Sequence, residues 1–206
     1  SGPVGGIAPY VTLAVLAASG EGDPRDLSVG EGDRLLLDLC RTITQTDLEV
    51  VAACPACGEL SEARLTTADV PAARPRMARL GVGGGLRAPT YGDLCGLPPD
   101  AGDAIQELLA RCVVGTPSRA PTVDDLERVD DSLAGPIEMA SAACGGPIAV
   151  DIDIEQAVLE RLDRRAREIA VEVHLLASAY HWSLSEIESL DDRRRETLAR
   201  LVVDSR

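Results

Sequence analysis

Cys54-Pro55-Ala56-Cys57-Gly58 predicts a metal-binding turn between two β-strands in this 206-residue chain. Two thiolates at this spacing can reach one metal ion, and the glycine lets the backbone turn back beneath it. A tetrahedral zinc site needs two further ligands. The nearest similar stretch is Ser141-Ala142-Ala143-Cys144-Gly145, in which Ser replaces the first cysteine. We therefore predict a structural Zn²⁺ site built from Cys54, Cys57 and Cys144, formed if the two turns face one another.

The fourth ligand of this site is left open, because a neutral serine hydroxyl is a poor ligand for zinc. The candidates for it are Cys40, Cys95, Cys112, His174 and His181. The alternative is a site that has lost its metal, in which the turns persist by packing and the cysteines are small buried hydrophobic residues. A dithiol oxidoreductase that uses Cys54 and Cys57 is a further alternative. It is disfavoured because the long helix that lowers the thiol pKa in such motifs does not follow Cys57.

Both cysteine turns stand between segments with the pattern of β-strands. Residues 48–53 lead into the first turn and 59–66 leave it, whereas 133–140 lead into the second turn and 148–154 leave it. Each pair of segments is expected to form an antiparallel hairpin. Because the order of strand, turn and returning strand is the same in both halves, the sequence indicates a duplicated hairpin unit.

Apolar residues at helical spacing predict helices around these hairpins. Short helices are expected over 10–18, over 34–43 with Asp33 as the N-cap, from Asp100 onwards, and over 122–131. Residues 70–85 are rich in Gly and Pro, which is typical of an exposed linker.

The C-terminal quarter has the clearest helical pattern. From Ile154 to Tyr180, apolar residues recur every three or four positions, which predicts one long helix with an apolar stripe. Ser183 and Glu186 have the spacing of a capping box and predict a short second helix, and an aspartate soon afterwards begins a third. We expect the stripe that ends at Tyr180 and Trp182 to be partly intramolecular core, with the outer face of the helical hairpin available to a partner.

The predicted fold is therefore α+β: two small zinc-ribbon-like hairpin units surrounded by helices, with a long C-terminal helix and a short helical hairpin. We expect three segments. Residues 1–80 hold the N-terminal helix and the first hairpin unit, and residues 81–153 hold a linker, helices and the second, degenerate hairpin unit. Residues 154–206 form the C-terminal helical segment.

The charge of the chain excludes several classes of partner. The formal net charge is −14 and the pI is about 4.5, so the surface would repel a nucleic-acid backbone or an anionic membrane. The longest apolar run, 11–18, is far shorter than the roughly 20 residues that span a bilayer. We therefore expect a cytoplasmic protein with no nucleic-acid partner and no membrane insertion, whose cysteines are thiols or metal ligands.

No catalytic motif emerges from the sequence, so an enzyme is not expected. His174 and His181 lie two turns apart near one helix end, where packing explains them. The run Gly81–Gly85 lacks the following Lys and Ser or Thr of a phosphate-binding loop. In so acidic a chain, Arg193-Arg194-Arg195 indicates internal or partner salt bridges.

Several motifs occur in an order that resembles a known family. The C-terminal run Glu172-Val173-His174-Leu175-Leu176-Ala177-Ser178-Ala179-Tyr180-His181-Trp182-Ser183 precedes Glu186-Ile187, Leu190 and Arg193-Arg194-Arg195. Earlier in the chain stand Leu27-Ser28-Val29-Gly30, Asp33, Leu35-Leu36-Leu37, the Cys54 turn and Arg87-Ala88-Pro89-Thr90-Tyr91-Gly92-Asp93-Leu94. This succession resembles a baseplate protein family of contractile-tailed phages and extracellular contractile injection systems. Members of the family commonly show two Cys-x-x-Cys-Gly turns, and Ser141 departs from that pattern.

The resemblance implies a non-enzymatic structural or assembly component of the baseplate or hub of an injection machine. Its partners would be other baseplate or hub proteins in a hetero-oligomeric assembly, and the protein would be incorporated into a phage-tail-like particle. The alternative is a cytosolic assembly chaperone or adaptor that is absent from the mature particle. The residues expected to contact partners are Tyr180, Trp182, Arg193, Arg194 and Arg195.

Overall fold

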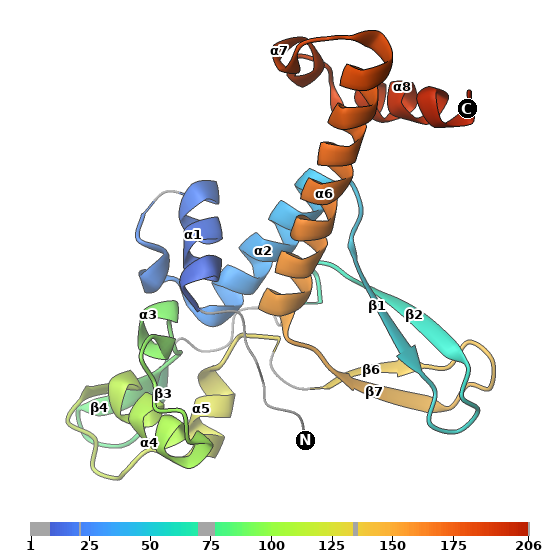
Figure 1. Ribbon diagram of the computed structural model, residues 1–206. Helices are drawn as coiled ribbons and strands as arrows, with labels where there is room; N and C mark the ends of the chain where they lie inside the picture. Colours follow the sequence, from blue (N-terminus) through green and yellow to red (C-terminus); the bar gives the residue numbers. More distant parts are fainter. Residues whose placement is uncertain (1–8, 21, 70–76, 134–135, 206) are drawn as a thin grey trace. The chain divides into compact units, whose positions relative to one another are not determined.

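The computed structural model describes residues 9–20, 22–69, 77–133 and 136–205. The fold is α+β, as predicted, with small antiparallel sheets, surrounding helices and a long helix toward the C-terminus (Figure 1). Contacts between residues group the chain into two compact units, Ser1–Leu159 and Glu160–Arg206, and the boundary falls inside the long helix. All of the described strands belong to the first unit.

Both predicted hairpins are present. Strand β1 (Leu48–Ala53) pairs antiparallel with β2 (Leu60–Leu65), and β6 (Pro136–Ala140) pairs antiparallel with β7 (Pro147–Asp151). The turns that close them have the same backbone bonds: Cys54 N donates to Glu59 O at 2.9 Å, and Ser141 N donates to Gly146 O at 2.8 Å. The glycine of each turn has a positive φ, 78° at Gly58 and 72° at Gly145. A glycine accepts this conformation at little cost, so both turns form for the same local reason.

The N-terminal helices are α1 (Pro9–Ser19), the 3₁₀ turn η1 (Pro24–Asp26) and α2 (Val29–Thr44). The prediction that Asp33 caps a helix beginning at residue 34 is wrong. Helix α2 begins one turn earlier, where Ser28 and Glu31 form a reciprocal capping box. Gly30 and Gly32 lie inside the helix because neighbouring groups approach it closely: a Cβ at Gly32 would overlap the ring of Tyr91.

The middle of the chain forms a three-stranded sheet covered by helices. Its strands are β3 (Met77–Arg79), β4 (Gly84–Arg87) and β5 (Val113–Gly115), in the order β3-β4-β5, and its helices are α3 (Tyr91–Leu94), α4 (Ala101–Cys112) and α5 (Val123–Val129). The expected exposed linker over 70–85 is therefore wrong from residue 77 onwards, and residues 70–76 lie outside the described part. One side of the sheet packs on a core of Leu80, Leu86, Leu109, Cys112 and Val129. Strands this short carry too few alternating residues to be recognised from their pattern.

The second unit contains most of α6 (Ile154–Tyr180) together with α7 (Leu184–Glu188) and α8 (Asp192–Asp204). The long helix and the capping box of Ser183 and Glu186 are confirmed, and Asp191 caps α8. His181 ends α6 with a φ of 56°. The unit has its own core, which consists of Leu176, Ile187, Ala199 and Val202 with Trp182 packed against it.

A buried ion-pair network holds α6 to α8 within this unit. Glu172 of α6 is 8% exposed and accepts hydrogen bonds from Arg165 at 3.0 Å and Arg195 at 2.9 Å. Arg195 also donates to Asp192 at 2.6 Å. A buried carboxylate with two guanidinium partners is well satisfied, but either charge would be costly to bury alone.

Candidate metal centre

The two hairpin turns face one another, and their ends form a cluster of three sulfurs and one hydroxyl. Cys54 Sγ lies 3.6 Å from Cys144 Sγ, and Cys57 Sγ lies 3.6 Å from Ser141 Oγ. The three sulfurs are all within 4.8 Å of one another. A tetrahedron of sulfurs at a Zn–S distance of about 2.3 Å has edges of about 3.8 Å. The cluster therefore has the dimensions of a metal site, and Ser141 stands at its fourth corner.

Cys54 and Ser141 receive the same kind of hydrogen bonds from the backbone amides of their turns. The N–H groups of Ala56 and Cys57 are directed at the Cys54 sulfur, and those of Ala143 and Cys144 donate to Ser141 Oγ at 3.3 Å each. The second turn thus has the shape of a cysteine knuckle with an oxygen in place of one sulfur. The matching hydrogen bonds of the two turns explain why the same sequence pattern occurs at both.

The electrostatics of the first turn favour a thiolate. Hydrogen bonds from the backbone N–H groups of Ala56 and Cys57 lower the pKa of the Cys54 thiol from 9.0 to about 7. Burial opposes this shift, and contacts with Cys144 and Ser141 add to it. A lowered thiol pKa serves a metal ligand and a redox nucleophile alike. Since Cys54 and Cys57 lie on a hairpin turn, backbone amides of that turn replace the helix N-terminus of the oxidoreductase motif.

The cluster is buried on one side and open on the other. Cys54 is only 2% exposed, whereas Cys57 and Cys144 are exposed. A Cβ at Gly146 would lie 3.2 Å from Cys144 Sγ and 3.7 Å from Cys54 Sγ, so this glycine keeps the approach to both sulfurs clear. Ser61, which is buried in β2, accepts a hydrogen bond from Ala142 N at 3.1 Å and so joins the two hairpins beside the site. Ser61 and Gly146 were not predicted as site residues, because only their positions relative to the opposite turn reveal their roles.

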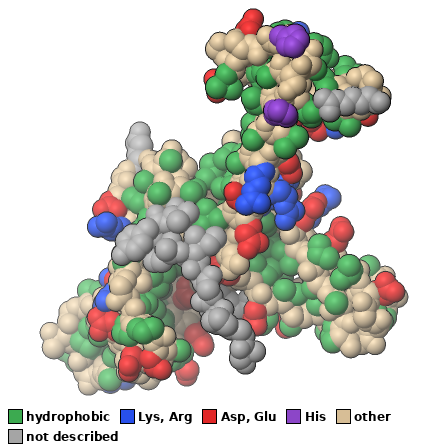
Figure 2. Space-filling model, viewed as in Figure 1, with side chains coloured by type: hydrophobic (Ala, Val, Ile, Leu, Met, Phe, Trp, Pro, Cys, Tyr) green, Lys and Arg blue, Asp and Glu red, His purple; other side chains and the backbone are tan. Residues whose placement is uncertain are grey.

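The three cysteines predicted as candidates for a fourth ligand lie outside the cluster. Cys40 and Cys112 are fully buried in α2 and α4, and Cys95 donates to the backbone carbonyl of Tyr91. His174 and His181 belong to the second unit, where both side chains are exposed (Figure 2). Among the described residues, only the three cysteines group as potential metal ligands at this place.

The chain has no significant similarity to the known proteins with which it was compared. No protein-family model matches the chain, and neither the curated proteins nor the solved structures yield a significant match. Within the described ranges, no helix is both long enough and apolar enough to cross a membrane.

The residues predicted to contact a partner lie in the second unit and differ in exposure. Tyr180 is 40% exposed and stacks on Trp182, with ring centroids 5.0 Å apart. Trp182 itself packs on the core of the unit. Arg193 and Arg194 are exposed, whereas Arg195 is 7% exposed and bonds to acidic residues inside the unit. Arg195 thus has a structural role, and Tyr180, Arg193 and Arg194 are accessible.

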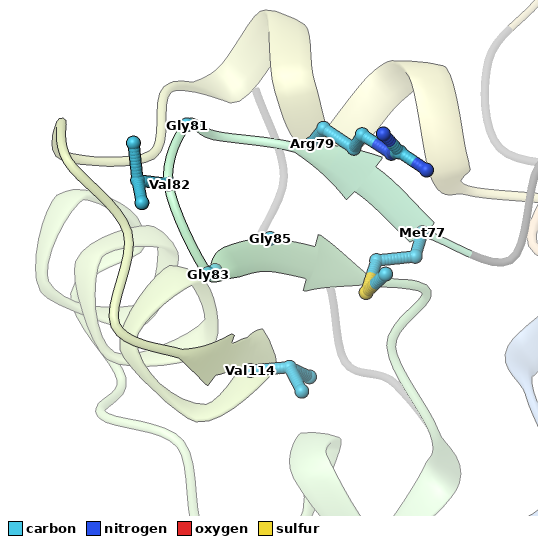
Figure 3. Close-up of a pocket in the computed structure, with 8 residues that line it drawn as sticks. Met77, Arg79, Gly81, Val82, Gly83, Gly85 and Val114 are labelled. Carbon is cyan, nitrogen blue, oxygen red and sulfur yellow. The ribbon is translucent and has the colours of Figure 1, made fainter.

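The three-stranded sheet has a concave surface on one of its faces. A cavity of about 570 Å³ lies over the face of the sheet that is turned away from its core, and its wall includes Met77, Arg79, Val82 and Val114 (Figure 3). Gly85 forms part of its floor, where it is covered by the side chain of Met77. Arg79 is the one charged residue in the described lining. This face is an apolar surface with a single cationic group.

A cluster of acidic residues lies between α2 and the start of α6, within the first unit. The Asp33 carboxylate is 4% exposed and accepts a hydrogen bond from Leu133 N at 2.9 Å. Burial, assisted by the negative charges of Glu155, Asp130 and Asp131, raises the pKa of Asp33 to about 7, although the hydrogen bond from Leu133 N opposes this shift. A small cavity of about 130 Å³ adjoins the carboxyl group.

We expect Asp33→Asn to stabilise the protein at pH 8 but not at pH 4. The folded-state pKa of Asp33 lies above its unfolded value of 3.8, so folding favours the protonated form, and this residue's contribution to stability falls as the pH rises from about 4 to about 7. Asparagine keeps an oxygen for the N–H of Leu133 and carries no charge. The gain at pH 8 should be about 2 kcal/mol, less than the full shift would give because water can enter the adjoining cavity.

Urea denaturation of both proteins at pH 4 and pH 8 measures this difference. Asp38→Asn, at an exposed position of the same helix, is the matched control. A gain from Asp33→Asn that is equal at the two pH values would show that the charge of Asp33 is not its cause.

Proposed function

We propose that Cys54, Cys57 and Cys144 hold one structural Zn²⁺ ion that fastens the β1–β2 hairpin to the β6–β7 hairpin. The proposal is supported by the distances of 3.6 Å across the cluster, which approach the edge of a tetrahedral zinc site. It is also supported by the backbone amides that favour a thiolate at Cys54. The fourth position would be taken by the Ser141 hydroxyl or by a water molecule. Elemental analysis of protein purified without added zinc should give about one zinc per chain; no metal in a folded protein would contradict the proposal.

We further propose a non-enzymatic role for the whole chain. It would be a structural or assembly component of the baseplate or hub of a phage-tail-like contractile injection system, acting by protein–protein contacts. The metal would suit this role, because thiolates from two hairpins that share one ion fasten the hairpins together and so stabilise a small scaffold.

The observation that carries this role is how the C-terminal signature folds. The residues that resemble the baseplate family build the interior of the second unit: Glu172 and Arg195 form its buried ion pair, and Leu176 and Ile187 form its core. Large apolar side chains remain outside on the same unit. They are Val171, Leu184, Leu201 and Val203, each more than half exposed. Exposed apolar side chains of this size on a small folded unit are suited to contact neighbouring subunits.

Purified contractile particles from the organism that encodes this chain would test the role. We expect the chain in particles at a fixed ratio to the other baseplate proteins. Leu201→Asp should lower its incorporation, because a carboxylate would be placed in an apolar interface. Val51→Asp, at an equally exposed position of β1 in the first unit, is the matched control.

Other results have distinct meanings. If the chain is found on assembly intermediates but is missing from finished particles, it is the chaperone or adaptor of the alternative hypothesis. If it is missing from both, the role in the injection machine is contradicted, and the metal proposal is unaffected because it is measured on the isolated protein.

A further inference from the structure

The serine at the fourth corner changes the chemistry of the thiols as well as the metal site. Across the cluster, Cys54 faces Cys144, and Cys57 faces Ser141. A cysteine at position 141 would give two thiol pairs between the hairpins. With serine there, Cys54 and Cys144 form the one facing pair, and Cys57 faces a hydroxyl that cannot be oxidised to a disulfide.

We propose that Cys54 and Cys144 form a reversible disulfide when a peroxide-class oxidant reaches the metal-free site. This rests on the same cysteines as the proposed zinc site and adds the regulation of that site, but it does not require that the metal be bound. The cross-link would join the two hairpins covalently. It would also consume two of the three metal-ligating sulfurs, so disulfide formation and metal binding exclude one another.

The reaction balances with hydrogen peroxide as the oxidant. The thiolate of one cysteine attacks a peroxide oxygen and the O–O bond breaks. The hydroxide that leaves takes up the proton released when the thiol ionised, so a sulfenic acid and one water molecule form. The second thiol then attacks the sulfenic sulfur, the S–O bond breaks, and the disulfide and a second water molecule form. Two thiols thus lose two electrons and two protons to the peroxide.

The exposure of the two cysteines indicates which of them performs each step. Cys144 is exposed and can meet the oxidant, whereas Cys54 is buried beneath it and is placed to resolve the sulfenic acid. Their sulfurs must approach from 3.6 Å to about 2.05 Å. The absence of a side chain at Gly146, beside both sulfurs, leaves room for this movement. Cys57 lies within 4.8 Å of the same atoms and is the competing thiol.

Peptide mapping of the full-length protein would test the proposal. The protein is stripped with a chelator, treated with hydrogen peroxide, and digested with trypsin without reduction. Cys54 and Cys57 share one tryptic peptide and Cys144 lies in another, so the expected product is a cross-linked pair of peptides that disappears after reduction. Cys57→Ser should retain the cross-link and Cys144→Ser should abolish it. Saturating Zn²⁺ should slow its formation at least tenfold in a protein that binds the metal.

The outcomes separate this proposal from the metal site. A disulfide between Cys54 and Cys57 within one peptide, a cross-link between two chains, or loss of the cross-link in a folded Cys57→Ser protein would each overturn it. If the untreated protein contains no zinc but forms the Cys54–Cys144 cross-link, the metal proposal fails and this inference stands. If zinc is bound and no cross-link forms after stripping, the reverse holds.

Discussion

Glu172→Ala is expected to destabilise the second unit by about 3–5 kcal/mol, because it leaves the buried guanidinium of Arg195 with half of its partners. The Arg195 side chain is 8% exposed, so water cannot replace the missing carboxylate. Arg165, whose side chain is 12% exposed, would lose its 3.0 Å bond at the same time. A unit of this size has little stability to spare, and we expect the variant to unfold it at room temperature.

The fluorescence of Trp182 reports this transition selectively, since it is the one tryptophan of the chain and packs on the core of the second unit. Glu168→Ala is the matched control: Glu168 lies on the same helix and pairs with Arg161 and Arg165, but its side chain is 45% exposed. An exposed pair is worth less than about 1 kcal/mol, so this control should melt close to the wild type. Equal effects of the two substitutions would refute a special role for the buried pair.

Ser141→Cys is expected to raise the affinity for Zn²⁺ by about 100-fold, on the order of 3 kcal/mol, because a fourth thiolate replaces a neutral hydroxyl. The position is already built for a thiolate. Ser141 Oγ accepts hydrogen bonds from two backbone amides and lies 3.6 Å from Cys57 Sγ, as a tetrahedral ligand must. Sulfur at this corner needs no rearrangement of the turn, since Cys54 occupies the equivalent position of the other hairpin.

Competition with a chromophoric chelator measures the affinity. Cys144→Ala should lose the metal, because only two thiolates remain. Ser178→Cys adds a thiol at an exposed position of the second unit and controls for non-specific binding. An affinity that Ser141→Cys leaves unchanged would mean that the corner does not face the metal.

The features that were predicted correctly depend on residues close together in the sequence. The two hairpins follow from Gly58 and Gly145 in turns between β-patterned segments, and α7 follows from the capping box of Ser183 and Glu186. The start of α2 was misplaced because Gly30 and Gly32 suggest a loop. Their actual reason is the close approach of Asp131 and Tyr91, which are remote in the sequence.

Local chemistry thus set the two turns, the long helix and the caps, since each needs hydrogen bonds and apolar spacing that neighbouring residues supply. Tertiary packing alone decided which distant groups meet. It brought the Ser141 hydroxyl to within 3.6 Å of Cys57 Sγ, and it directed Cys54 toward Cys144. It also buried Arg195 of the arginine run against Glu172 while leaving its two neighbours exposed. Such pairings depend on the packing of whole elements against one another, and no local pattern records them.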